Sequence, residues 1–131
     1  MLDIKQIEPF YPENLRPFKR NLLREYVQVK ILETLFESDW SQKLVFMGGT
    51  AIHLFHGNTR FSEGLDFDNL GLDKSHFGLL ISAVLTSLRR HGFNVENRNV
   101  FRTAFRSYLK FSDLLYKYKI SRHRHEKLNI Q

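Results

Sequence analysis

Two aspartates that lie two residues apart are the best candidates for chemistry in this chain. They belong to the segment GLDFDN at 64–69, in which apolar and acidic residues alternate. Alternation with period two predicts a strand whose exposed face carries Asp66 and Asp68, about 6.6 Å apart, while its apolar residues face a core. Carboxylates on one face, together with phosphate oxygens, are typical ligands of Mg²⁺. An acidic strand edge that only keeps the sheet soluble is the alternative interpretation.

A paired-glycine turn precedes this strand. The apolar run at 44–47 predicts a buried strand that leads into Gly48 and Gly49, after which Thr50 begins a short helix. Glycines allow a close backbone approach, and the free N–H groups at a helix N-terminus bind anions. The turn therefore predicts a triphosphate site. Arg60 is a further candidate phosphate ligand, with a surface ion pair as its alternative role.

The second half of the chain is strongly basic. Residues 71–131 contain twelve Lys and Arg against four Asp and Glu, whereas residues 1–70 contain eight against ten. This asymmetry favours a nucleotide or nucleic-acid partner. Residues 101–111 alternate as a strand, and one face of it carries Arg102, Arg106 and Lys110 with Tyr108 among them. Such a face can bind backbone phosphates and stack a base; a plain solvated face is the alternative.

Two amphipathic helices are predicted to support these strands. Apolar residues recur at three- and four-residue steps over about 21–36, and again from Asp73 to about residue 91. Asp73 is the expected N-cap of this second helix, with Ser75 as the alternative. The first twenty residues contain all three prolines, which predicts an extended lead-in with one short turn. Further strands are predicted at 93–98 and 127–131, with a short helix at about 114–117.

Composition limits the remaining possibilities. A chain of 131 residues with 42% hydrophobic content fits a single globular domain over 1–131, of the α/β (α+β) class, with a small mixed sheet flanked by helices. The absence of cysteine excludes disulfides and thiolate metal sites. Neither a signal peptide nor a membrane-spanning apolar run is visible, so a soluble cytoplasmic protein is expected.

The segment LVFMGGTAIHLFHGNTRFSEGLDFDN resembles the signature of the AbiEii/AbiGii toxin family, a branch of the DNA polymerase β-like nucleotidyltransferase superfamily. That signature is an apolar strand, GGTA, a short helix and RFSEDLDF, and the similarity extends from about Leu22 to the C-terminus. The resemblance implies a minimal nucleotidyltransferase core that transfers a nucleoside monophosphate from an NTP to an acceptor such as tRNA. It implies that Gly48, Gly49 and Thr50 hold the triphosphate. It further implies that Ser62 bonds a phosphate oxygen, that Asp66 coordinates Mg²⁺ and that a cognate antitoxin is a partner.

The chain departs from the family pattern at two acidic positions. The first metal-binding aspartate falls at Gly64, and the third carboxylate is expected on a later strand that begins near Gln131. Two hypotheses follow: a nucleotidyltransferase with an incomplete acidic set, or an inactive remnant that binds nucleotide, RNA or a partner protein. An unpaired strand edge near Gln131 also predicts self-association through that edge.

Overall fold

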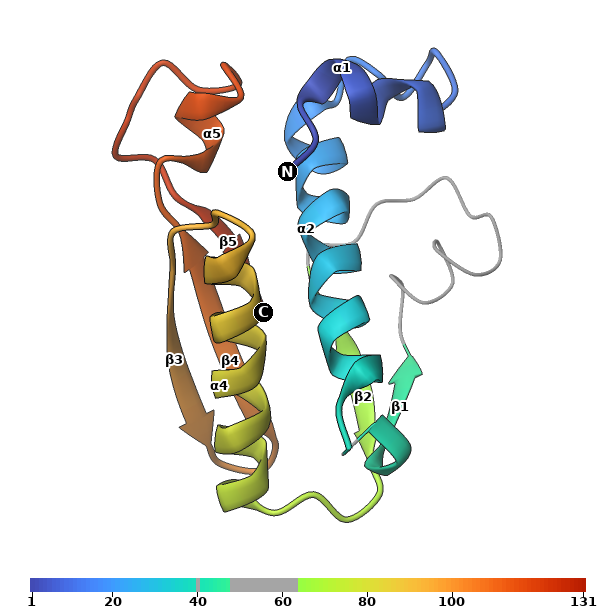
Figure 1. Ribbon diagram of the computed structural model, residues 1–131, viewed down its shortest axis with the longest axis vertical. Helices are drawn as coiled ribbons and strands as arrows, with labels where there is room; N and C mark the ends of the chain where they lie inside the picture. The colour runs from blue at the N-terminus through green and yellow to red at the C-terminus, as the bar shows by residue number, and fades with distance from the viewer. Residues whose placement is uncertain (40, 48–63) are drawn as a thin grey trace.

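The computed structural model describes residues 1–39, 41–47 and 64–131 (Figure 1). In chain order the elements are α1 (Ile4–Ile7), η1 (Glu8–Phe10), α2 (Lys19–Glu37), η2 (Ser41–Lys43), β1 (Leu44–Met47), β2 (Asp66–Asn69), α4 (Lys74–Arg90), β3 (Val95–Phe101), β4 (Phe105–Phe111), α5 (Leu114–Lys117) and β5 (Leu128–Ile130). The predicted α/β class, a small sheet flanked by helices, is confirmed.

The strands form two antiparallel ladders. One is the pair β1–β2, and the other is the three-stranded sheet β3–β4–β5. Within the described ranges every pairing is antiparallel, whereas the sequence predicted a mixed sheet. The backbone N–H of Leu65 donates to the carbonyl of Gln131 at 2.9 Å. This bond places the start of β2 beside the end of β5.

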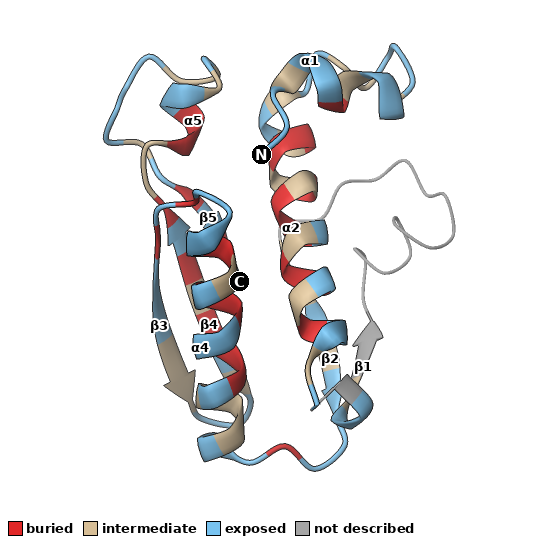
Figure 2. Cartoon of the chain, in the orientation of Figure 1, coloured by how far each residue is buried: buried red, intermediate tan, exposed pale blue. Residues whose placement is uncertain are grey.

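The two long helices cover one face of the larger sheet. Helix α4 packs on β3 and β4, and α2 packs on α4 and β5 (Figure 1). Their buried sides contain the predicted apolar stripes (Figure 2). The predicted N-cap of α4 is confirmed, because the Asp73 carboxylate accepts a hydrogen bond from the His76 N–H at 2.8 Å. The core therefore lies between the helices and one side of the sheet, and no helix of the described ranges packs on the other side.

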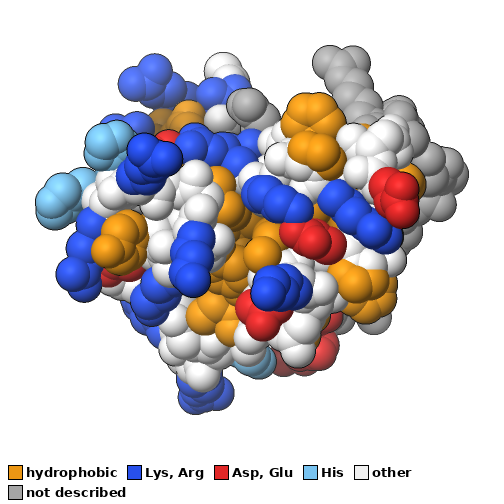
Figure 3. Space-filling model, turned by 90° about the horizontal axis from the view of Figure 1, so that it is seen from above, with side chains coloured by type: hydrophobic (Ala, Val, Ile, Leu, Met, Phe, Trp, Pro, Cys, Tyr) orange, Lys and Arg blue, Asp and Glu red, His pale blue; other side chains and the backbone are white. Residues whose placement is uncertain are grey.

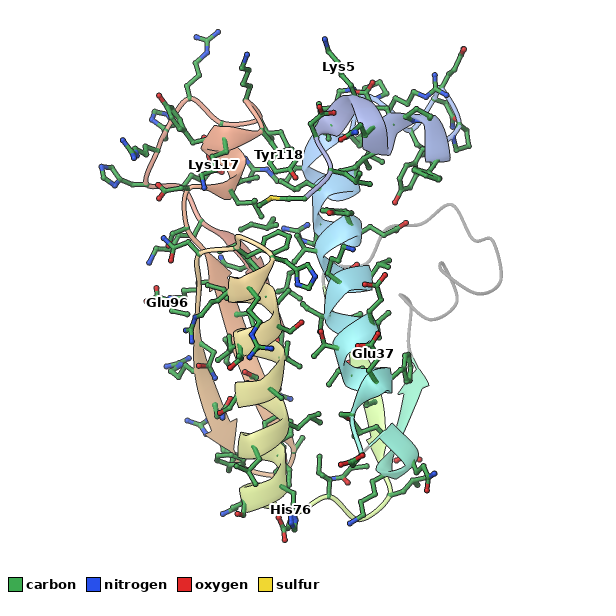
Figure 4. The ribbon with its side chains drawn as sticks, in the orientation of Figure 1. Lys5, Glu37, His76, Glu96, Lys117 and Tyr118 are labelled. Carbon is green, nitrogen blue, oxygen red and sulfur yellow. The ribbon has the colours of Figure 1, made fainter. Side chains whose placement is uncertain are left out.

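The N-terminal segment differs from the predicted extended lead-in. Asp3 and Gln6 form a capping box at the start of α1, with reciprocal bonds of 2.9 and 3.0 Å. Pro9 then lies in the first turn of η1, where its missing N–H costs nothing. The Leu2 N–H donates to the Tyr26 hydroxyl at 3.0 Å, and the Tyr118 hydroxyl donates to the Leu2 carbonyl (Figure 4). These bonds attach the segment to α2 and to the residue after α5.

Tyr118 makes this attachment sensitive to alkaline pH. Burial, with smaller effects of Tyr26 and Asp3, raises the pKa of Tyr118 from 10.0 to about 12. Because the folded-state pKa is raised, its stabilising contribution is complete below pH 10 and is lost as the pH rises towards 12. We expect Tyr118→Phe to be about 1 kcal/mol less stable than the wild type at neutral pH. Urea unfolding should show this difference shrinking between pH 10 and 12, and a constant difference would contradict the assignment.

Lys119 ends α5 in the left-handed conformation, with φ of 59°. The N–H groups of Lys119 and Ile120 close the helix by bonding to Tyr116 and Leu115, in the pattern of a Schellman motif. Glycine has no Cβ to oppose this conformation, so Lys119→Gly should stabilise the fold by roughly 0.5–1 kcal/mol. Lys117→Gly, inside α5, should instead destabilise the fold by a similar amount. Urea denaturation measures both changes in the free energy of unfolding.

The same unfolding curves test the number of domains. If residues 1–131 form one domain, a single unfolding transition is expected.

Candidate functional site

The exposed face of β2 carries both candidate metal ligands. Asp66 and Asp68 are exposed, whereas Leu65 and Phe67 are partly buried and pack against the core. In the β1–β2 ladder, Asp66 lies opposite Met47 and Asp68 lies opposite Val45. The predicted alternation of β2 is thus confirmed, while the metal-binding role of the two carboxylates stays a prediction.

Asp66 borders a hollow of about 740 Å³ on the side of the sheet opposite to α2 and α4. Strand register brings together the side chains around it, since Arg98 lies opposite Tyr108, and Lys110 lies between Glu96 and Asn129. We call this surface the open face: Glu96 and Arg98 of β3, Arg106, Tyr108 and Lys110 of β4, and Asn129 of β5. Asp66 of the acidic strand β2 and side chains of the open face therefore line the same hollow.

The charges on the open face are partly paired. Lys127 Nζ lies 2.7 Å from Glu96 Oε1. This hydrogen bond, with the charges of Lys127 and Lys110, lowers the pKa of Glu96 below its usual range. The Arg98 guanidinium lies 5.3 Å from the centre of the Tyr108 ring, a distance suited to a cation–π contact. Basic groups and an aromatic ring thus lie beside Asp66.

Two of the three residues of the predicted basic stripe, Arg106 and Lys110, lie on β4. Arg106 and Lys110 are exposed on β4, and the alternate residues Ser107, Leu109 and Phe111 are buried, as expected. Arg102, however, lies in the turn between β3 and β4, where its N–H donates to the Ala104 carbonyl at 3.3 Å. The predicted strand 101–111 therefore contains a hairpin end, and Arg102 lies outside the ladder.

Sequence reasoning missed three side chains of the open face: Glu96, Arg98 and Asn129. Alternation gave no signal for Glu96 and Arg98, because residues 96–98 of β3 are polar and all exposed. In β5, Leu128 and Ile130 are buried and Asn129 between them is exposed. Their position next to Tyr108 and Lys110 depends on strand pairing, which local patterns do not give.

The donor set near Asp66 fits a cation that arrives with a substrate. Mg²⁺ commonly binds one or two carboxylates and completes its shell with phosphate oxygens and water. Asp66 and Asp68 would supply two carboxylates, and the polar side chain that β5 adds to the hollow is the Asn129 amide. Among residues 1–39, 41–47 and 64–131, no three His, Asp or Glu side chains gather into a metal cage.

Gly64 permits the close approach of β2 to β5. A Cβ at this position would lie 3.0 Å from the Gln131 carbonyl oxygen, closer than side chains ordinarily come. The same carbonyl accepts the hydrogen bond from Leu65. The contact gives a physical reason for glycine where the family signature has aspartate.

The remaining candidates cannot be placed. Gly48, Gly49, Thr50, Arg60 and Ser62 lie outside the residues that the structure describes. Their roles in binding the triphosphate stay predictions.

Comparison with known proteins decides the family. The family model described as "Nucleotidyl transferase AbiEii toxin, Type IV TA system" matches residues 30–129. The chain belongs to this family. The match begins within α2 and reaches β5, so this AbiEii domain includes both the acidic strand and the open face, and the attached N-terminal segment precedes the match. No curated protein and no solved structure matches the chain.

No helix in the described ranges combines the length and the apolar character needed to cross a bilayer.

Proposed function

We propose that this AbiEii domain transfers a nucleoside monophosphate from an NTP to a hydroxyl group of a nucleic acid such as tRNA. The observation that carries the proposal is the position of Asp66, exposed at the border of a hollow that also contains Arg98, Tyr108 and Lys110. A carboxylate suited to a metal–phosphate complex thus lies beside groups suited to a polyanion. Because NTPs are its proposed substrates, we place the reaction in the cytoplasm.

Each part of the site has a proposed role. Asp66 and Asp68 would hold Mg²⁺, which when bound neutralises negative charge on the phosphates. The triphosphate would bind to Gly48, Gly49, Thr50, Arg60 and Ser62. The acceptor hydroxyl would release its proton to solvent as its oxygen bonds to the α-phosphorus, and the bond from the α-phosphorus to the bridging oxygen would break so that pyrophosphate leaves. Membership of a toxin–antitoxin family adds a cognate antitoxin as the proposed protein partner.

A second candidate function is nucleotide or RNA binding without turnover. Two observations favour it. Strand β5 contributes an amide, that of Asn129, and no carboxylate to the hollow, and Gly64 has no side chain to bind metal. Because metal positioning and charge neutralisation supply most of the catalysis in phosphoryl transfer, a reduced carboxylate set should slow the chemistry more than it weakens binding.

One experiment separates the two candidates. Purified protein is incubated with Mg²⁺, total tRNA and each labelled NTP in turn, and NTP binding is measured in parallel by calorimetry. Label in tRNA that disappears in Asp66→Asn supports transfer. Asp66-dependent NTP binding without labelled tRNA supports the binding function, and the absence of both would contradict both candidates.

A further inference from the structure

We infer that the open face binds a single-stranded nucleic acid by stacking one of its bases on Tyr108, with the flanking phosphates held by Arg98, Arg106 and Lys110. The inference rests on the proposed function, because it identifies the surface that holds the acceptor strand. It is carried by strand register, exposure and the Arg98–Tyr108 contact.

Tyr108 is placed to stack a base. It projects from the open face at the centre of the sheet, is half-buried, and lines the same hollow as Asp66. The guanidinium of Arg98, on the neighbouring strand, already lies 5.3 Å from the ring centre. Aromatic rings and Arg planes are the groups on which proteins stack unpaired bases. Asn129 lies on β5 in register with Lys110 of β4. Its amide can donate a hydrogen bond to a base edge and accept one from it.

The positive charge extends further than one nucleotide requires. Arg106 and Lys110 lie two residues before and after Tyr108 on the same face, so they are about 13 Å apart along β4. The Lys127–Glu96 bond then joins the open face to the loop between α5 and β5. That loop and the end of α5 contain Lys117, Lys119, Arg122 and Arg124. At the end of the molecule that carries α1 and α5, Lys and Arg side chains surround an apolar surface (Figure 3).

These features favour a single strand over a duplex. The bases of a duplex are stacked on one another and hide their faces, whereas an unpaired base can turn towards a half-buried ring. Because Asp66 borders the same hollow, a strand end held at Tyr108 has its terminal hydroxyl beside the proposed nucleotide site. Glu96 of β3 (Figure 4) does not prevent this, since Lys127 pairs with it.

The test is a binding measurement without NTP or Mg²⁺. A fluorescently labelled six-nucleotide RNA is titrated with the protein, and anisotropy gives Kd at several salt concentrations. Tyr108→Ala should weaken binding by roughly fivefold or more, whereas Tyr108→Phe, which keeps the ring, should stay within about twofold. Arg98→Ala should weaken binding and reduce the slope of log K against log salt by about one. An RNA hairpin with all its bases paired should bind more weakly than the single strand.

Arg90→Ala is the matched control, because Arg90 is exposed at the end of α4, in the helix layer that covers the opposite side of the sheet. It should bind the RNA within about twofold of the wild type. Equal effects of Arg98→Ala and Arg90→Ala, or equally tight binding of the paired hairpin, would overturn the inference. This comparison of two arginines still decides the question if Tyr108→Ala does not fold, which circular dichroism reports.

The outcome is separable from that of the proposed function. Asp66→Asn should bind the six-nucleotide RNA at least as tightly as the wild type, because it removes a negative charge from the hollow that Tyr108 lines, whereas it should abolish tRNA labelling. If RNA binding ignores Tyr108 and Arg98 while tRNA labelling still depends on Asp66, the acceptor surface is wrong and the transfer proposal stands. If binding depends on both residues but no label is transferred, the transfer proposal fails alone.

Discussion

Replacing Asp66 by asparagine is expected to lower Mg²⁺-dependent NTP affinity by roughly tenfold or more, and any transfer to tRNA by roughly 100-fold or more. The substitution keeps the size of the side chain and removes its charge. Asp66 is exposed on β2, so the fold should not change. Calorimetric titration of NTP, with and without Mg²⁺, measures the first effect, and incorporation of label into tRNA measures the second.

Two further carboxylates serve as comparisons. Asp68→Asn changes the other acidic side chain of β2, which shares its exposed face but is not among the residues that line the hollow. Its effect should therefore be smaller than that of Asp66→Asn. Glu13→Gln removes a charge from the exposed N-terminal segment and should change nothing. A larger loss in Asp68→Asn would make Asp68 the principal ligand, and unchanged binding in both β2 variants would remove this strand from the site.

Local signals predicted most of the fold. The spacing of apolar residues identified α2 and α4, Asp73 identified the start of α4, and alternation identified β2. The expected strand at 127–131 is present as β5. The extended lead-in predicted for residues 1–20 differs from the structure, because Asp3 and Gln6 form a capping box that begins a helix and because proline at the first turn of a short helix is favourable.

The site was less predictable, because it depends on contacts between residues far apart in the chain. Sequence patterns identified Asp66, Arg106 and Lys110, all of which are exposed as expected. They could not show that Arg98 lies over Tyr108, since that contact requires the β3–β4 register. Nor could they explain Gly64, whose neighbour is the carbonyl of a residue 67 positions later. The membership in the AbiEii family was readable because its signature is a local run of residues.

Position 129 is the place where an added carboxylate should strengthen the site. Asn129 is exposed on β5 between two buried residues, and it lines the hollow with Asp66 and Lys110. Asn129→Asp replaces the amide by a carboxylate of the same size, and the positive charge of the neighbouring Lys110 offsets the new negative charge. Mg²⁺ binding to the NTP complex would gain a further oxygen ligand in the same space. We expect Mg²⁺-dependent NTP affinity, or transfer where it is detectable, to rise by roughly tenfold.

Gly64→Asp, the change that the family signature suggests, should behave differently. Its Cβ would meet the Gln131 carbonyl oxygen at 3.0 Å, so β2 and β5 must separate slightly to admit it. The variant should lose roughly 1 kcal/mol or more of stability, as overpacked positions do, whereas Asn129→Asp should unfold at the same urea concentration as the wild type. Asn129→Ala controls for loss of the amide, and Asn129→Asp combined with Asp66→Asn should cancel the gain if both carboxylates hold one ion. A gain that survives removal of Asp66 would show that position 129 acts on a separate site.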